Sequence, residues 1–360
     1  MRILCVIDSL GSGGAQRQLV NLGILFKKKG HDVNFLVYHS SDFYAGTLES
    51  YGIKVVTVTE SSYFRRLFKM ARVIRRGSYD SVLSFLEAPN LICELAAVFP
   101  RKWRLVVGER SANPAILSSF KRKIFRFFHF FADAIVANSN ENINMVKKVA
   151  PFLPRKKMHV IYNAVDLSVW EPNHQSYSVR DGGRLTVTVT ARHNYLKNLD
   201  GLVEALRLLP LPERDKLLVK WYGRFDDGDD SLDSAKRKIA RYGLECNFEF
   251  LLPIENIYEE VNKADVVGLF SFYEGLPNSV CEGMVNSKVV ISSDVSDVKS
   301  LVGDSFVFNP KEPSELARIL SETLALSDEE LESIGKANRR RALKLFDPDR
   351  VASEYLELLA

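Results

Sequence analysis

The sequence predicts an α/β protein made of two doubly wound domains, each a parallel sheet with helices on both faces. Short apolar runs rich in β-branched residues alternate with amphipathic segments along the chain, as buried parallel strands and their covering helices do. A glycine loop at residues 11–14 separates the first such run from the first helical segment. The length of 360 residues suits two domains better than one.

The first half of the chain supplies one complete set of elements. We predict strands at 1–7, 33–38, 53–58, 81–85, 105–107, 134–137 and 159–161. Helical segments lie between them at 15–29, 63–76, 90–98 and 118–132. The stretch 168–184 is polar and loses this periodicity, so we take it as the linker between a first domain, 1–167, and a second, 185–343.

The second half repeats the architecture without repeating the sequence. Strands are predicted at 185–190, 217–222, 247–251, 264–270, 289–291 and 306–308, and helices at 199–209, 231–242, 257–263, 280–286 and 313–326. A long helical tail follows from residue 328 to 359 and is interrupted near Phe346–Pro348.

Composition excludes several classes of protein. With 46% hydrophobic and 26% charged residues the chain has the make-up of a water-soluble globular protein. It has no apolar run of about 18 residues, so we predict no membrane span. The apolar start, Met1–Leu10, runs into the glycine loop and reads as a first strand, not as a signal peptide. Four scattered cysteines without metal spacing fit a reducing compartment.

Charge is distributed unevenly between the halves. The net charge of the chain is +4, but residues 1–170 carry a net charge of +13 and residues 171–360 a net charge of −9. A basic first half indicates an anionic partner there, such as a membrane surface, lipid phosphate or nucleic acid.

The glycine loop does not fit a nicotinamide site. The sixth position of the dinucleotide pattern is Gln16, and no acidic residue ends the second strand, where the ribose would require one. Gly13 and Gly14 could still let backbone amides approach a phosphate, although a simple tight turn explains them equally well.

The segment 118–132 is amphipathic and basic. On one helical face lie the apolar residues Phe120, Ile124, Phe127, Phe128 and Phe131. On the opposite face lie Arg122, Arg126 and His129. Two readings stay open, a helix packed on the core with a solvated basic face and a helix resting on an anionic membrane. Nucleic acid is disfavoured, because the aromatics are not interleaved with the basic residues.

The stretch 264–291 reads as strand, loop, helix, strand and carries two carboxylates. Glu274 lies in the loop, and Glu282 follows eight residues later, about two turns into the helix. The helix begins near Asn278 and Ser279, and a helix N-terminus is a natural anion site. Phosphate at that end with a carboxylate on either side would suit a sugar nucleotide, whereas two solvent-facing glutamates are the plainer alternative.

Two cations follow the first strand of the second domain. Arg192 and Lys197 lie in the loop A-R-H-N-Y-L-K-N, and ligands of doubly wound sheets bind at the carboxyl ends of strands. Together with the glutamate pair they could meet a diphosphate and offset the negative charge of a leaving group. The acidic run in 223–230 could hold a hard cation, but a solvated loop is the better reading.

These motifs, taken together, resemble glycosyltransferase family 4. The resemblance rests on the E-x7-E pair Glu274 and Glu282, on the cations Arg192 and Lys197, and on four further runs: G-G-A-Q-R-Q-L (13–19), A-N-S (137–139), I-Y-N-A-V-D (161–166) and F-D-P-D-R-V-A-S-E-Y-L (346–356). It covers nearly the whole chain in order. It implies a GT-B fold, with two facing Rossmann-like domains and a crossover helix, about 344–360, returning to the first.

The resemblance also implies site roles. Glu274, Arg192 and Lys197 would be catalytic, with Glu274 at the transferred sugar and the two cations at the donor diphosphate. Residues 251–254 would hold the base. The other donor-binding residues would be Glu282, Gly13, Gly14, Gly275, Leu276, Pro277, Asn278 and Ser279. Family members retain anomeric configuration and usually need no metal, so no cofactor is expected.

The acceptor side departs from many members of the family, which carry a histidine or aspartate there. The loop here is G-E-R-S-A-N-P (108–114), as in members that build bacterial lipid-linked glycans, so Glu109, Arg110 and Asn113 are the acceptor-side candidates. We therefore expect a retaining hexosyltransferase that uses a UDP-sugar and a polyprenyl-diphosphate-linked glycan. It would be cytoplasmic, would rest on the inner face of the membrane and would bind no nucleic acid. A soluble sugar acceptor and a non-catalytic binding module are the alternatives.

Overall fold

The computed structural model describes residues 1–41, 43–172, 183–225 and 228–360, in two compact units. Unit 1 comprises Met1–Ala164 and Pro348–Ala360, and unit 2 comprises Val165–Asp347. Most of the predicted linker 168–184 and part of the acidic run 223–230 lie outside the described residues.

Unit 1 is built on a seven-stranded parallel sheet in the order β3-β2-β1-β4-β5-β6-β7. The central strands are almost fully buried, which explains their continuous apolar runs. The strands are β1 (Arg2–Val6), β2 (Asp32–Val37), β3 (Lys54–Thr57), β4 (Ser81–Phe85), β5 (Arg104–Glu109), β6 (Ala134–Ala137) and β7 (Met158–Val160).

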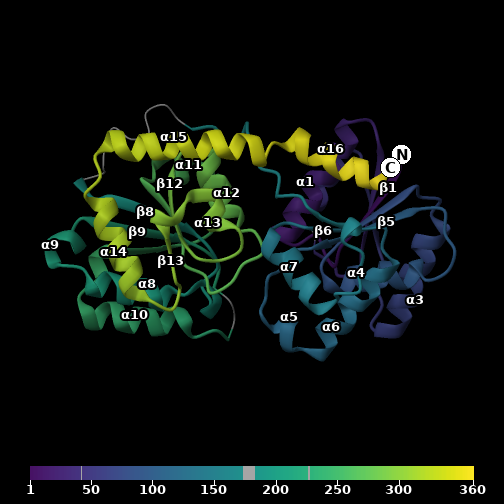
Figure 1. Cartoon of the computed structure of the whole chain (residues 1–360), viewed down its shortest axis with the longest axis horizontal. Coiled ribbons are helices and arrows are strands. Elements are labelled where there is room, and N and C mark those ends of the chain that lie inside the picture. The colour runs from purple at the N-terminus through teal and green to yellow at the C-terminus, as the bar shows by residue number, and fades with distance from the viewer. Residues whose placement is uncertain (42, 173–182, 226–227) are drawn as a thin grey trace. The chain divides into compact units, whose positions relative to one another are not determined.

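Helices cover both faces of this sheet (Figure 1). Alternate residues of β1 point to opposite faces, so Ile3 and Cys5 pack with α1 (Gly14–Lys28) while Leu4 and Val6 pack on the other side. That second face carries α3 (Tyr63–Arg76), α4 (Glu87–Ala97) and α7 (Asn140–Val149). The rest of the layer is α5 (Ala115–Ser118), α6 (Phe120–Phe127) and the 3-10 turn η1 (Phe128–Phe131), and α2 (Ala45–Ser50) follows β2.

The last helix of the chain belongs to unit 1. α16 (Pro348–Leu359) packs beside α1, and its Tyr355 lies in the same apolar cluster as β1. The Ser81 hydroxyl donates to the Leu359 carbonyl at 2.5 Å. The predicted return of the C-terminal segment to the first domain is thus confirmed.

Unit 2 repeats the topology with six parallel strands in the order β10-β9-β8-β11-β12-β13. The strands are β8 (Leu185–Thr190), β9 (Leu217–Tyr222), β10 (Phe248–Leu251), β11 (Val266–Leu269), β12 (Val289–Ser293) and β13 (Val307–Phe308). The helices are α8 (Leu199–Leu208), α9 (Leu211–Arg214), α10 (Ser231–Tyr242), α11 (Ile257–Lys263), α12 (Asn278–Val285), α13 (Val298–Val302), α14 (Pro313–Leu324) and α15 (Asp328–Leu345), and η4 (Tyr195–Lys197) is a short 3-10 turn.

The doubly wound α/β prediction is confirmed in both units, and every predicted strand is present. Both sheets reverse their strand order at one point, between β1 and β4 in unit 1 and between β8 and β11 in unit 2. Ligands of doubly wound sheets bind at the carboxyl ends of the strands beside this reversal. The predictions missed α2, α5, α7, α9 and α13, helices too short or too polar to give a strong periodic signal.

Candidate functional site

The strand-order reversal of unit 2 brings together the two loops on which the sequence places its charged residues. β8 and β11 are hydrogen-bonded neighbours, although about 75 residues separate the loops that follow them. The loop after β8 holds Arg192 and Lys197, and the loop after β11 holds Glu274. Both loops leave the carboxyl ends of parallel strands, so they lie at the same edge of the sheet.

The side chains of Lys197 and Glu274 meet at this edge. The Lys197 ammonium lies 2.5 Å from Oε1 of Glu274, and both side chains are only about one-fifth exposed. The same carboxylate oxygen accepts a hydrogen bond from the Ser271 hydroxyl at 2.8 Å. Because an ammonium carries three N–H groups, the pairing with Glu274 leaves Lys197 able to donate to a further anion.

The loop after β8 is held rigidly. Asn198 adopts a left-handed backbone conformation with φ of 54°, caps α8 through Gly201 N and donates to the Pro310 carbonyl at 2.8 Å. The two loops are tied directly, because Phe272 N donates to the Leu196 carbonyl at 2.9 Å. Lys197 therefore reaches Glu274 from a fixed backbone.

His193 anchors the start of the same loop. Its buried ring stacks on Trp221 and Phe225, and burial together with the charge of Lys236 lowers its pKa to about 4. It is thus neutral near pH 7 and serves packing. The adjoining backbone is so close that a Cβ on Gly223 would lie 1.9 Å from the Ala191 carbonyl oxygen, which only glycine avoids.

The N-terminal end of α12 lies in the second loop. Pro277 is the residue before the helix, and a helix N-terminus attracts anions through its first-turn amides and its dipole. Glu282 lies in the middle of α12 and is buried to 7% exposure. Of the remaining predicted donor residues here, Gly275, Leu276, Pro277 and Ser279 are buried and Asn278 is partly exposed.

The other predicted donor contacts are placed as follows. Arg192 is exposed at the beginning of the β8 loop, and the predicted base-binding stretch 251–254 follows β10 with residues 252–254 exposed. Gly13 is the residue before α1 and Gly14 its first residue, in unit 1. A phosphate contact at this helix N-terminus stays a prediction.

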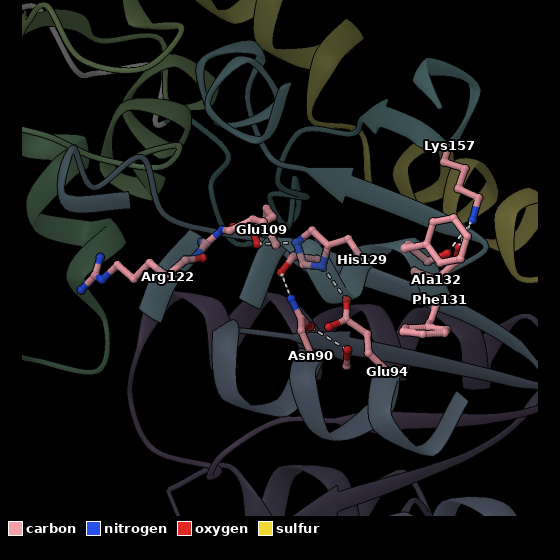
Figure 2. Close-up of polar contacts among 12 residues, drawn as sticks. Asn90, Glu94, Glu109, Arg122, His129, Phe131, Ala132 and Lys157 are labelled. Atoms are coloured by element: carbon pink, nitrogen blue, oxygen red, sulfur yellow. Dashed lines mark hydrogen bonds and ion pairs between the residues drawn. The ribbon is translucent and has the colours of Figure 1, made fainter. Parts of the chain in front are cut away.

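On the acceptor side, Glu109 is part of a buried ionic network. Its two carboxylate oxygens are separately engaged, Oε2 by Arg126 at 2.7 Å and Oε1 by His129 at 2.8 Å. The other ring nitrogen of His129 lies 2.5 Å from Glu94, so that the imidazole is clamped between two carboxylates (Figure 2). Arg126 also pairs with Glu87 at 2.5 Å.

The network perturbs the pKa values of its members. Burial alone would raise the pKa of Glu109, but Arg126 and His129 hold it at about 2. Burial would lower the pKa of His129, but Glu94 and Glu109 raise it to about 9, so the ring is an imidazolium that donates from both nitrogens. Burial raises the pKa of Glu94, against the opposing charge of His129.

The predicted solvated basic face of the segment 118–132 is wrong. Arg126 and His129 are fully buried, whereas Phe120, Ile124 and Phe127, expected on the core side, are exposed. The physical reason is the network, which the helix alone does not reveal. A usable signal was Glu94, a single acid within the apolar run L-I-C-E-L-A-A.

Glu109 is 4% exposed and both of its oxygens are engaged, so the network holds the carboxylate inside unit 1. Arg110 points elsewhere, with its guanidinium 3.6 Å from the centroid of the Phe85 ring and hydrogen-bonded to Asn163 and the Tyr355 hydroxyl. Asn113 accepts from Ala115 N at 2.9 Å at the start of α5. Of the three acceptor-side candidates, the structure gives Glu109 a packing role.

The described residues offer neither a candidate metal site nor a helix suited to span a membrane. Among those residues there is no cluster of three or more histidine, cysteine, aspartate or glutamate side chains arranged to hold a metal ion. Nor does any described helix have the length and apolar character needed to cross a bilayer.

Two family models match the chain in succession. Residues 12–169 match "Glycosyltransferase Family 4", and residues 171–341 match "Glycosyl transferases group 1". The boundary between the two matches falls within a few residues of Val165, where unit 2 begins, so each model covers most of one doubly wound unit.

Curated relatives and solved structures agree with these matches. An alpha-1,4-N-acetyl-D-galactosaminyltransferase of Campylobacter jejuni, named for a GalNAc-GalNAc-diNAcBac-PP-undecaprenol acceptor, is 27% identical over 100% of this chain and 98% of its own. A second Campylobacter jejuni N-acetylgalactosaminyltransferase, named for a diphospho-undecaprenol acceptor, is 25% identical over 98% of each. Anabaena HepE in complex with UDP superposes with a TM-score of 0.88 at 20% identity, over 100% and 99% of the two chains.

Proposed function

The chain belongs to the family-4 glycosyltransferases, and from that premise we propose that it is a retaining enzyme that transfers a hexose or N-acetylhexosamine from a UDP-sugar to a polyprenyl-diphosphate-linked glycan. The relatives named for undecaprenol-linked acceptors, matched over 98% of their lengths, support the acceptor class. The observation that carries the catalytic part is the Lys197–Glu274 pair at the strand-order reversal of unit 2.

The donor diphosphate would lie at the carboxyl edge of the unit 2 sheet. Lys197 and Arg192 would supply positive charge, and the first-turn amides of α12 would donate to the phosphate oxygens. Glu282 would accept hydrogen bonds from the ribose hydroxyls. Its burial supports this role, because a carboxylate removed from water binds hydroxyl donors strongly. The amides at Gly13 and Gly14 remain a predicted phosphate contact.

In the proposed chemical step, negative charge develops on the donor diphosphate, next to Lys197. The bond between the anomeric carbon and the donor phosphate oxygen breaks as the acceptor oxygen bonds to the same face of that carbon. The acceptor proton passes to the departing phosphate oxygen, which needs no protein base. Lys197 would stabilise the negative charge that grows on the diphosphate, and Glu274 would orient both Lys197 and the sugar.

Two cations and a helix end already neutralise the diphosphate in this scheme, so we propose that transfer needs no metal. We further propose that the enzyme works at the cytoplasmic face of the membrane. Its basic first half, with a balance of +13 over residues 1–170, supports contact with anionic lipid. Of the acceptor-side candidates we retain Arg110 and Asn113, and we propose a structural role for Glu109.

The experiment is an acceptor-dependent transfer assay. Purified protein is incubated with UDP-N-acetylgalactosamine, or with other UDP-sugars, and either a polyprenyl-diphosphate-linked glycan or the same glycan free in solution, with and without EDTA. We expect UDP release and an α-linked product only with the lipid-linked acceptor, and no effect of EDTA. Equal turnover on the free glycan would favour the soluble-acceptor alternative. Nucleotide binding without release on any acceptor would indicate a binding module.

A further inference from the structure

The segment α5–α6–η1 presents its apolar side to solvent. Phe120, Ile124 and Phe127 recur every three or four residues along α6, so they lie on one face of that helix, and Phe130 follows three residues later in η1. Phe120 is 77% exposed, and Phe127 and Phe130 are each 56% exposed. An amphipathic helix of a globular domain normally buries this side, so the stripe requires an explanation.

The buried carboxylates of unit 1 set this orientation. Glu87, Glu94 and Glu109 hold Arg126 and His129 inside the domain, where both side chains are fully buried while the stripe is exposed. Figure 2 shows His129 between Glu94 and Glu109. Removing one partner of a buried ion pair costs about 3–5 kcal/mol, so the helix cannot rotate to hide its phenylalanines without a large penalty. The outward aromatic side is a fixed feature of the fold.

Neighbouring segments extend and border the stripe. The Phe152 ring, itself half exposed, lies 5.3 Å from Phe127, centroid to centroid. Lys157 donates to the Phe130 carbonyl at 3.0 Å and places its ammonium 5.6 Å from the centre of the Phe130 ring. Lys121 and Lys123 are exposed on the helix. Residues 110–132 contain no acidic residue.

From this arrangement we propose that Phe120, Ile124, Phe127 and Phe130 form a lipid-insertion stripe, which lies in the interface of a bilayer that contains anionic lipid. Exposed aromatics with a cationic border are what an interfacial helix requires. A second copy of this chain fits less well, because a two-fold interface would bring the same lysines against each other. The inference rests on the membrane contact of the proposed function, which was argued from net charge alone. It adds the surface that makes the contact and states that this surface inserts into the bilayer.

The test measures vesicle binding without any sugar. Full-length protein is mixed with phosphatidylcholine vesicles with or without phosphatidylglycerol, at low and high salt, and bound protein is separated by flotation. We expect binding to phosphatidylglycerol vesicles that weakens with salt but persists, since insertion adds an apolar contribution that salt does not screen. The variant Phe120→Ser/Phe127→Ser should bind about tenfold or more weakly at both salt concentrations.

Leu211→Ser is the matched control, because Leu211 is an equally exposed apolar residue on α9 of unit 2 and should leave binding unchanged. Phe127→Trp should show blue-shifted emission and quenching by brominated lipid in the presence of vesicles, and Leu211→Trp should show neither. Wild-type binding by the double serine variant, or no binding of wild-type protein at low salt, would overturn the stripe. The stripe would also be overturned if light scattering detects a dimer of the wild-type protein, and if the double serine variant loses this dimer but still binds vesicles.

Transfer is scored separately, with a detergent-dispersed acceptor that needs no membrane docking. There the double serine variant should turn over as the wild type does. A failed transfer assay would therefore leave the vesicle result standing, and failed vesicle binding would leave the proposed reaction standing.

Discussion

Lys197 and Glu274, 77 residues apart in the chain, form an ion pair of 2.5 Å at the point where the unit 2 sheet reverses its strand order. The pair joins the loop after β8 to the loop after β11, and a backbone hydrogen bond from Phe272 to Leu196 reinforces the join. Glu274 lies four residues before the start of α12, and in the proposed reaction the donor diphosphate lies at this edge of the sheet.

Glu274→Gln tests the carboxylate of this pair. The amide keeps the shape and a hydrogen bond but loses the charge that orients Lys197 and the sugar. We expect transfer to fall by about 10²-fold, while the affinity for UDP, measured by calorimetry, stays equal or rises because Lys197 is released toward the diphosphate. Unchanged transfer would remove Glu274 from the reaction.

Glu282→Ala tests the nucleotide contact. Loss of a hydrogen bond between a charged group and ribose costs about 1.5–3 kcal/mol, so the Kd for the UDP-sugar should rise by roughly ten- to hundredfold. The matched control is Glu322→Ala, which removes an exposed glutamate of α14 that pairs with its neighbour Arg318. If both variants bind UDP alike, Glu282 does not contact the donor.

Glu109→Ala distinguishes packing from acceptor binding. The change leaves Arg126 and His129 buried without their shared carboxylate, so the free energy of unfolding in denaturant titrations should fall by about 3–5 kcal/mol. Glu87→Ala, which removes the partly exposed member of the network, should cost only about 1 kcal/mol. A raised KM for the acceptor with unchanged stability would instead restore Glu109 to the acceptor site.

The network also makes stability depend on pH. The pKa of His129 is raised from 6.5 to about 9, so the folded state binds more protons than the unfolded state between these values. The contribution of His129 to the free energy of unfolding is complete below pH 6.5 and declines as pH rises through about 9. Between pH 6.5 and 8 the free energy of unfolding should therefore decrease by about 2 kcal/mol.

Above pH 8 a second buried group opposes this trend. Burial lowers the pKa of Lys288 to about 8, so its deprotonation favours the folded state at higher pH. His129→Gln should flatten the slope between pH 6.5 and 8. A slope that persists in this variant would assign the pH dependence to other groups.

Much of the fold could be predicted from local pattern. The strands are short, apolar and β-branched, and the loops that bear Lys197 and Glu274 follow two of them, so their shared edge follows from the doubly wound topology alone. Their direct pairing could not be predicted, since spacing does not specify which side chains meet across adjacent loops.

The rotation of α6 could not be predicted for a related reason. Periodicity identifies an apolar face and a basic face but not which one the domain buries. The answer depends on Glu87, Glu94 and Glu109, which lie 39, 35 and 17 residues from their partners in sequence. Long-range ion pairs outweighed the burial of phenylalanines, an outcome that local pattern reasoning does not foresee.

The measurement that tests the central claim most directly is UDP release by wild-type protein and by Lys197→Ala, side by side, with a UDP-N-acetylhexosamine and a polyprenyl-diphosphate-linked glycan. The account predicts acceptor-dependent release by the wild type and a loss of about 10²- to 10³-fold in a folded Lys197→Ala protein, because the growing charge on the diphosphate loses its buried counter-ion. Equal release by the two proteins would contradict it.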